Sequence, residues 1–243
     1  MRGILLAGAV AAFGALTAFC EPSAFSVRQV FSPERFTRGD TTMRAIQDAD
    51  RAAWIRPPKA NEGFFRFRKD FESDGSPLRF DVTADERFVL LLDGRTVASG
   101  PHRGLVDHWY YQSYEVTGLS AGAHRLEALV WRIGWAEPLA QLSWNFGFLL
   151  KAEGAYDAML TTGKAEWKVG RLVNTRMTKK ASMRMFGVGS CCEVKGTSFL
   201  DEEPSDWSVA KTVRGPCTKV YAGLVAQGWM LFPTILHDMM FER

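Results

Sequence analysis

The sequence contains few cysteines, and none of them lies in a metal-binding pattern. Four occur among 243 residues, no two are spaced as Cys-x-x-Cys, and no histidine lies at zinc-finger spacing. The sequence therefore predicts no metal site, and we expect no cofactor. Adjacent Cys191 and Cys192 are poorly placed to bridge each other. One of them could pair with Cys217, and three reduced thiols are an equal alternative.

Charge of one sign is not concentrated anywhere along the chain. The net charge is +3, and the basic residues are interspersed with acidic ones over the whole length. Nucleic-acid-binding proteins usually gather Lys and Arg on one face or along one segment. The sequence therefore predicts no nucleic-acid partner.

Long apolar runs are also missing, except at the N-terminus. Arg2 precedes an uncharged, largely apolar run of sixteen residues from Ile4 to Phe19, which is shorter than the roughly 20 residues that span a bilayer. Small residues and Pro22 follow, with Ala18 three places before a predicted cut after Cys20. This pattern favours a cleaved signal peptide within residues 1–24 over a membrane anchor, and it predicts an exported, periplasmic or extracellular protein without a transmembrane segment.

Period-two alternation begins at residue 64 and indicates β-strands. Phe65, Phe67 and Phe71 alternate with polar residues, which is typical of a strand with one face in the core. Asp93-Gly94 is the strongest hairpin signal. The expected strands are 64–71, 78–84, 88–92, 95–98, 109–116, 124–131 and 143–151, with edge strands at 156–160 and 167–172.

Short strands at regular spacing, with turn residues between them and no strong helix, predict an all-β protein built as an antiparallel sandwich. A jelly roll fits the number of strands best. We divide the chain into the signal peptide 1–24, an irregular N-terminal segment 25–60, a β-sandwich domain 61–177, and residues 178–243. This last part is interpreted as a connecting segment or an incomplete second β-module.

An ordered set of motifs resembles the N-terminal, non-catalytic sandwich region of bacterial α-L-rhamnosidases of glycoside hydrolase family 78. The motifs are Ala53-Trp54-Ile55, the strand 65–71, Val82 to Phe88, the hairpin from Leu92 to Gly100-Pro101, Tyr114 to Thr117, Leu119 to Gly122, His124 to Leu126, Pro204-Ser205-Asp206-Trp207, and Trp229 to Pro233 with Ile235, Asp238 and Met239. Glu115 and Thr234 depart from the family's usual residues at those places.

The resemblance implies a galactose-binding-domain-like sandwich whose catalytic carboxylates would stand in a downstream (α/α)₆ barrel. Glycoside hydrolysis needs two carboxylates across the scissile bond, and no such pair is readable in this sequence. We therefore predict no catalytic residue here, and the resemblance leaves open whether the chain alone is an enzyme.

The aromatic stretch 107–111 is the most suggestive binding feature. Sugars stack on aromatic rings while charged side chains take their hydroxyls, so the candidate carbohydrate-binding residues are Trp109, Tyr111, Trp135, Asp107 and Arg103. The alternative, that these aromatic rings fill the core of the sandwich and its edges, is the more favoured of the two.

Three functional hypotheses follow. The chain is the accessory, carbohydrate-binding front of a rhamnosidase-like protein, a stand-alone exported carbohydrate-binding protein, or a truncated product without activity. The expected partners are rhamnose-containing or other plant and bacterial glycans.

Overall fold

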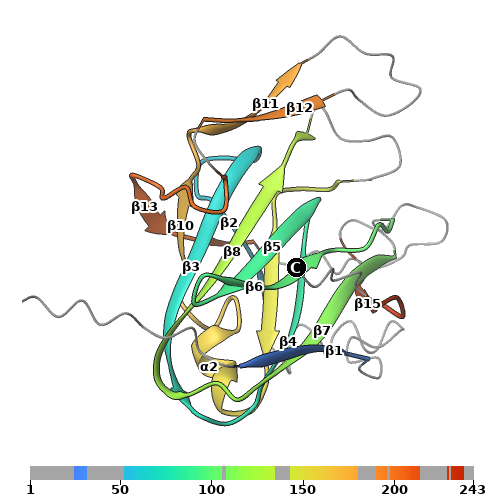
Figure 1. Cartoon of the computed structure of the whole chain (residues 1–243). Helices are drawn as coiled ribbons and strands as arrows, with labels where there is room; N and C mark the ends of the chain where they lie inside the picture. The colour runs from blue at the N-terminus through green and yellow to red at the C-terminus, as the bar shows by residue number, and fades with distance from the viewer. Residues whose placement is uncertain are drawn as a thin grey trace, which may run out of the picture.

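The computed structural model describes residues 25–31, 52–105, 108–134, 143–179, 190–195, 198–213, 229 and 231–237. Two sheets face each other across one core, as Figure 1 shows, and a third, two-stranded sheet extends from one end. Within the two main sheets all strand pairs are antiparallel except one. The predicted antiparallel β-sandwich is confirmed.

The seven-stranded sheet contains β1 (Ser26–Val30), β7 (Trp109–Thr117), β4 (Leu78–Ala84), β9 (Phe148–Ala152), β2 (Trp54–Arg56) and β14 (Lys211–Val213), in that order, with β15 (Leu231–Pro233) parallel to β7. The six-stranded sheet contains β13 (Trp207–Val209), β10 (Lys168–Arg171), β3 (Gly63–Asp74), β8 (Ala121–Arg132), β5 (Arg87–Leu92) and β6 (Arg95–Gly100). From β2 to β5 and again from β6 to β10, successive strands lie in different sheets, as expected of a jelly roll, whereas β5 and β6 form a hairpin within one sheet. The third sheet pairs β11 (Thr175–Lys179) with β12 (Ser190–Val194), which contains Cys191 and Cys192.

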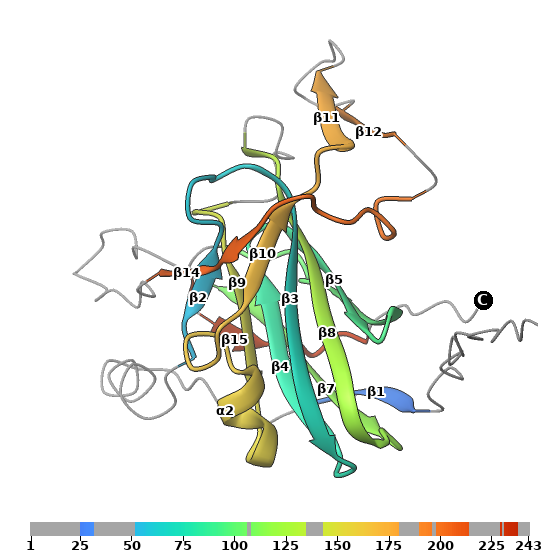
Figure 2. The ribbon, with the colours of Figure 1, turned by 90° about the vertical axis from the view of Figure 1, so that its left-hand side faces the viewer.

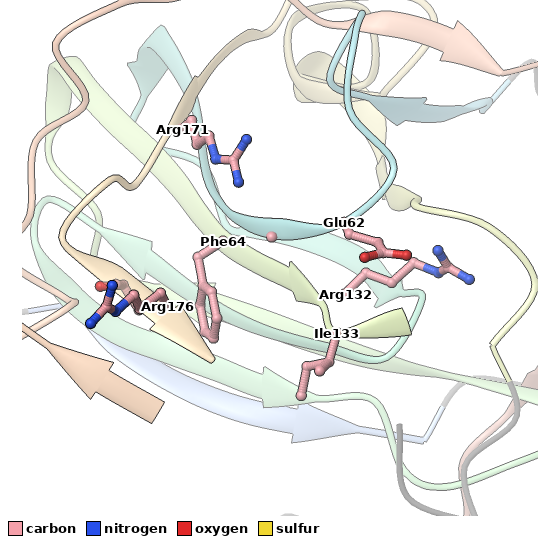
Figure 3. A pocket seen from close by; sticks show the side chains of 8 residues that line it. Glu62, Phe64, Arg132, Ile133, Arg171 and Arg176 are labelled. Carbon is pink, nitrogen blue, oxygen red and sulfur yellow. The ribbon is translucent and has the colours of Figure 1, made fainter. Parts of the chain in front are cut away.

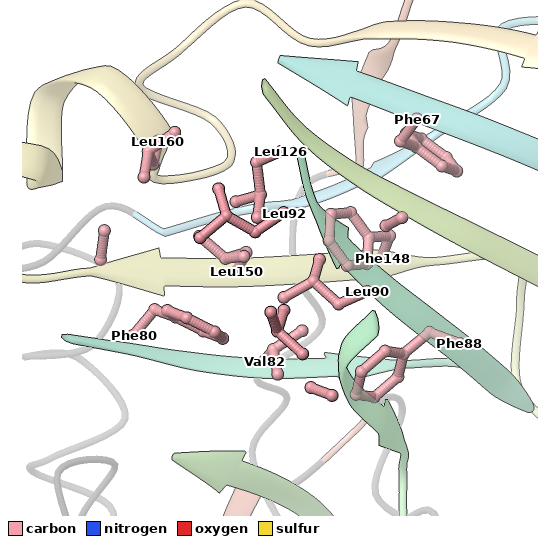
Figure 4. Close-up of a cluster of buried hydrophobic side chains, with 14 of the residues drawn as sticks. Phe67, Phe80, Val82, Phe88, Leu90, Leu92, Leu126, Phe148, Leu150 and Leu160 are labelled. Atoms are coloured by element: carbon pink, nitrogen blue, oxygen red, sulfur yellow. The ribbon is translucent and has the colours of Figure 1, made fainter. Parts of the chain in front are cut away.

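The core forms because successive residues of a strand point to opposite faces. Phe65, Phe67 and Phe71 of β3 point inward, as predicted, and meet aliphatic and aromatic residues of the other sheet. Figure 4 shows this cluster between the sheets, with Phe80, Val82, Phe148 and Leu150 opposite Leu90, Leu92 and Leu126. Burial of such side chains is the main favourable term in the stability of the sandwich.

The predicted Asp93-Gly94 hairpin is confirmed. Both residues have positive φ, 51° and 78°, which matches the twist of the β5 and β6 strands. Asp93 also accepts hydrogen bonds from the backbone N–H of Arg125 (2.8 Å) and pairs with His124 Nδ1 (2.7 Å). The turn is thereby attached to β8.

Two predicted strands differ in the structure. Residues 156–160 form part of a 3₁₀ turn (Gly154–Tyr156) followed by α2 (Asp157–Leu160). The Thr161 backbone N–H donates to the Asp157 carbonyl and closes the helical turn, while the Thr161 hydroxyl and the Lys164 ammonium bind the Asp157 carboxylate. β9 begins at Phe148 rather than residue 143, because the backbone N–H groups of Trp144 and Asn145 donate to the Asp85 carboxylate instead of to a neighbouring strand.

The segments outside 61–177 contribute strands to the sandwich. β1 and β2 come from the segment predicted to be irregular, whereas β13, β14 and β15 come from residues 178–243. Figure 2 shows β14 beside β2 and β10 beside β3. The sandwich therefore extends beyond both predicted boundaries, through strands too short to show a period. The predicted signal peptide 1–24 lies outside the described residues.

One residue of the C-terminal part is inserted into the outer face of the seven-stranded sheet. Trp229 stacks on Trp54 with centroids 3.9 Å apart, and the two rings form one buried cluster with Trp109 and Leu149. Gly147 makes room, because a Cβ there would lie 2.6 Å from Trp54 Cε3 and 3.2 Å from Trp229 Cη2. Trp229 Nε1 donates to Asp85 Oδ2 at 2.8 Å. In the described residues, no helix is long and apolar enough to cross a membrane.

Candidate carbohydrate-binding site

Two of the predicted binding aromatics are buried. Trp109 is 2% exposed and its Nε1 donates to Thr83 Oγ1 at 3.2 Å, while Tyr111 is fully buried. A ring without an exposed face cannot stack on a sugar in this conformation, so both side chains take the core role that the sequence favoured. The expected sugar platform at these two positions is not present in the structure.

The other predicted residues are not brought together. Arg103 is exposed in the segment after β6, whereas Asp107 and Trp135 lie outside the described residues. Burial and the positive charge of Arg103 lower the pKa of Arg87, although neighbouring Glu86 raises it. Two other tryptophans lie in neighbouring segments: Trp131 is packed between Phe64 and Phe199, and Trp144 is 42% exposed.

The structure places a different tryptophan beside a hollow on the outer face of the six-stranded sheet. We call it the Trp207 groove; it has a volume of about 460 Å³. Ligand pockets of small molecules have volumes of roughly 300–1,000 Å³. Its lining residues come from four adjacent strands: Arg68 and Asp70 of β3, Arg125 of β8, Lys168 of β10, and Trp207, Ser208 and Val209 of β13.

Strand register explains why these residues meet. Arg68 pairs with Lys168, Lys168 pairs with Val209, and Asp70 pairs with Arg125 across adjacent strands. Phe67 and Val169, which alternate with Arg68 and Lys168, lie in the core. The polar residues therefore project from the opposite, outer face of the sheet.

The Trp207 indole is held by a cation–π contact. The Arg68 guanidinium carbon lies 4.3 Å from the ring centroid. Arg68 is itself fixed by Glu127 (2.7 Å) and Glu203 (2.6 Å). Burial lowers the pKa of Arg68, but the hydrogen bonds to Glu203 and Glu127 more than offset it and the pKa lies above its ordinary value. One side of the ring is thus supported by a permanently charged group.

The rim of the groove is polar. Arg125 Nε and Asp70 Oδ1 form an exposed ion pair of 2.7 Å. In the described part of the chain, the Lys168 ammonium has no hydrogen bond or ion pair, and Val209 is half exposed. The groove therefore combines an aromatic ring with donors and acceptors, which is the chemistry that recognises a sugar.

The segment before Trp207 is fixed to the sheet. Glu202 accepts hydrogen bonds from the backbone N–H of Asn174 (2.6 Å) and from Thr175 Oγ1 (2.8 Å). Pro204 fills the space above Gly170, where any Cβ would overlap it. The sequence shows Pro204 to Trp207 only as a motif, because periodicity does not report the pairing of β13 with β10 that brings Trp207 to Arg68 of β3.

A second polar cluster lies between β4 and β5. Buried Asp85 accepts from Ser143 Oγ, the N–H groups of Trp144 and Asn145, and Trp229 Nε1. Burial raises the pKa of Asp85 despite these bonds. The Glu86 carboxylate accepts from the N–H groups of Ile133 (2.7 Å) and Gly134 (3.0 Å). Both carboxylates therefore hold backbone in place.

No group of three or more His, Cys, Asp or Glu residues that could hold a metal ion is found within the described ranges. No family model and no curated protein sequence matches the chain.

Among solved structures, the chain is similar to a family GH78 rhamnosidase from Bacillus sp. GL1. The TM-score is 0.52 and the identity 22%, over 75% of this chain and 19% of that one. The α-L-rhamnosidase from Dictyoglumus thermophilum gives a TM-score of 0.46 and 14% identity, over 78% and 23% of the two chains. A lectin from Pleurotus ostreatus gives a TM-score of 0.33 and 14% identity, over 61% of this chain and 43% of the lectin.

The chain thus spans about a fifth of the length of the two rhamnosidases. The overlap with the Bacillus protein shows a shared sandwich fold. The resemblance that the sequence motifs predicted is therefore confirmed at the level of fold, for a part that makes up about a fifth of such a protein.

Proposed function

We propose that this chain is a non-catalytic carbohydrate-binding module, the accessory part of an α-L-rhamnosidase-like glycoside hydrolase, and that it binds glycans in the Trp207 groove. The observation that carries the proposal is the groove itself. One indole ring is supported by Arg68, while Lys168, Asp70 and Arg125 surround it with charged donors and acceptors.

The similarity in fold adds support of a different kind. A sandwich of this type occurs within a GH78 rhamnosidase several times longer than this chain. Fold alone does not determine function, so the assignment depends on the chemistry of the groove. Rhamnose-containing glycans are the first ligands to test.

The first experiment measures binding of the full chain to neutral plant and bacterial polysaccharides by affinity electrophoresis. We expect retardation by at least one rhamnose-containing glycan, and a loss of about tenfold in affinity in Trp207→Ala because the stacking surface is removed.

The matched control is Trp144→Ala, which removes an exposed indole outside the groove. It should bind as the parent does. Equal binding by parent and Trp207→Ala, or loss of binding in Trp144→Ala alone, would contradict the groove as the site. Rhamnosidase activity of the purified chain would contradict the non-catalytic assignment.

We also propose that residues 1–24 direct export. N-terminal sequencing of the mature protein from the source cells tests this: a start within residues 21–25 supports it, and retention of Met1 contradicts it.

A further inference from the structure

A second hollow lies at the end of the six-stranded sheet, and arginine dominates its lining. We call it the Arg171 pocket; its volume of about 170 Å³ is smaller than that of a pocket for a whole small molecule and suits one charged substituent of a larger ligand. Figure 3 shows the side chains of Glu62, Phe64, Arg132, Ile133, Arg171 and Arg176 around it. They come from the start of β3 and the residue before it, the end of β8 and the residue after it, the end of β10, and β11. Three positive charges thus face one negative charge.

Gly63 lines the pocket, and Gly134 packs against the lining residue Glu62. Gly63 has φ of 119°, and its missing Cβ would lie 3.5 Å from Arg171 Nη2, so the guanidinium rests close to the backbone. The Glu62 carboxylate packs against Gly134, where a Cβ would lie 2.5 Å from Glu62 Oε1. Gly134 has φ of 60°, so a side chain there would be strained as well as crowded.

The three arginines are not equally engaged. Arg132 donates to Ser143 Oγ (2.6 Å) and to the Asn61 carbonyl (3.0 Å), and it lies 3.7 Å from Asp85. Arg176 also has an interaction partner. Arg171 differs, because its guanidinium has no hydrogen bond or ion pair in the part of the chain that is described, and it lies 5.9 Å from the Phe65 ring centroid.

A guanidinium presents several N–H donors in a plane that fits a carboxylate with two parallel hydrogen bonds. Arg171 is exposed and, among the described residues, no protein carboxylate binds its guanidinium, so those donors remain available to a ligand. Glu62, on the opposite wall, offers acceptors for hydroxyl groups. The combination of a planar cation, an acceptor and an apolar floor at Phe64 fits an acidic sugar better than a neutral one.

We propose that the Arg171 pocket binds the carboxylate of a uronic acid residue, so that the preferred glycan is acidic. This inference rests on the proposed carbohydrate-binding function and names its ligand class. The Trp207 groove has the same bias in charge, since Lys168 has no ionic partner within the described ranges while Arg125 is paired with Asp70.

The test is a titration of the full, isotopically labelled chain with D-glucuronate, D-glucose and acetate, monitored by NMR. We expect glucuronate to bind about tenfold more tightly than glucose, because a charge-assisted pair contributes more than a neutral contact. In Arg171→Gln this preference should disappear. Arg79→Gln on the other sheet is the matched control, since Glu115 keeps Arg28 as its partner, and it should retain the preference.

Equal affinity for glucuronate and glucose, or a preference that survives Arg171→Gln, would overturn the inference. Binding of acetate as tightly as glucuronate would overturn the assignment to a sugar. Trp207→Ala separates this result from the proposed function: it should lose neutral glycans while keeping the glucuronate preference. A parent that binds polysaccharide in the groove but shows no glucuronate preference would leave the function standing and refute the acidic ligand.

Discussion

Adjacent residues Asp85 and Glu86 each hold a loop through backbone N–H groups, and neither is exposed by more than 2%. Glu86 does so from a left-handed backbone conformation, with φ of 67°. Burial raises the pKa of Glu86 to about 7, with Asp85 adding to the rise, while the Ile133 and Gly134 N–H groups and Arg132 oppose it. Two neighbouring buried carboxylates thus carry an energetic cost at neutral pH.

The cost gives a pH dependence of known sign. The pKa of Glu86 is about 7 in the folded protein, whereas the ordinary pKa of a glutamate is 4.5. The unfolded state binds fewer protons between these values, so the free energy of unfolding falls as the pH rises from 4.5 to 7. We expect Glu86 to account for about 3 kcal/mol of that fall. Glu86→Gln should remove this part, as urea unfolding at pH 4.5 and pH 8 will measure.

Glu166→Gln removes an exposed carboxylate and is the matched control for the loss of one charge. If parent and Glu86→Gln lose the same free energy between the two pH values, Glu86 does not hold its proton in the folded state.

Single residues were predictable from sequence only where alternation applies. Period-two alternation predicts the inward phenylalanines of β3 correctly. The same alternation predicts that Arg66 is exposed to solvent, but it is only 4% exposed. Glu127 pairs with it at 3.2 Å and the Leu200 carbonyl accepts from it, and residue 200 is far away in the sequence. The site could not be predicted for the same reason, because β13 meets β10 through a contact between distant segments.

Among the elements, the C-terminal strand β15 and the nearby Trp229 are joined to the sandwich by backbone pairing and by one buried ring. β15 runs parallel to β7, and the Thr234 N–H donates to the Tyr111 carbonyl at 2.9 Å. The buried Trp229 ring lies in a space that exists because position 147 has no side chain. The attachment of the last described residues to the sandwich therefore depends on the packing of the Trp229 ring against Trp54.

We predict that Trp229→Ala lowers the free energy of unfolding by about 3–5 kcal/mol, because it leaves a cavity and removes a donor from Asp85. Urea unfolding will measure the change. Trp144→Ala, at an exposed ring, should change stability by about 0.5 kcal/mol or less. Comparable effects of the two substitutions would show that Trp229 is not packed as described.

A second substitution tests the same fit from the sheet side. Gly147→Ala places a methyl group 2.6 Å from Trp54, and we expect a cost of about 1–3 kcal/mol. Gly122→Ala is not an equivalent control, since φ of 124° disfavours alanine there. Ser205→Ala, an exposed position, serves instead and should leave thermal unfolding unchanged.

Elements with a strong local signal were predictable, and those without one were not. The strand 78–84 was predicted with both of its ends, and the Asp-Gly turn placed β5 and β6 together. β2, β13, β14 and β15 have three residues each, too few to show a period. Their places depend on pairing with longer strands, which sequence periodicity does not report.

At the scale of the molecule, the two hollows are features of one sheet. β3 lines both, with Phe64 in the Arg171 pocket and Arg68 and Asp70 in the Trp207 groove. Phe199 and Leu200 cover the apolar part of this face, against Trp131 and Leu129. The outer face of the six-stranded sheet is therefore where we expect ligands, rather than the 107–111 stretch that the sequence suggested.

The most direct measurement is a glycan titration followed through the indole N–H resonances of the eight tryptophans. The resonance that disappears in Trp207→Ala identifies Trp207, and we predict that it moves most on addition of ligand. The resonances of the buried Trp54, Trp109, Trp167 and Trp229 should stay in place. A stationary Trp207 resonance while another indole moves would show that the glycan binds elsewhere and contradict the groove as the binding site.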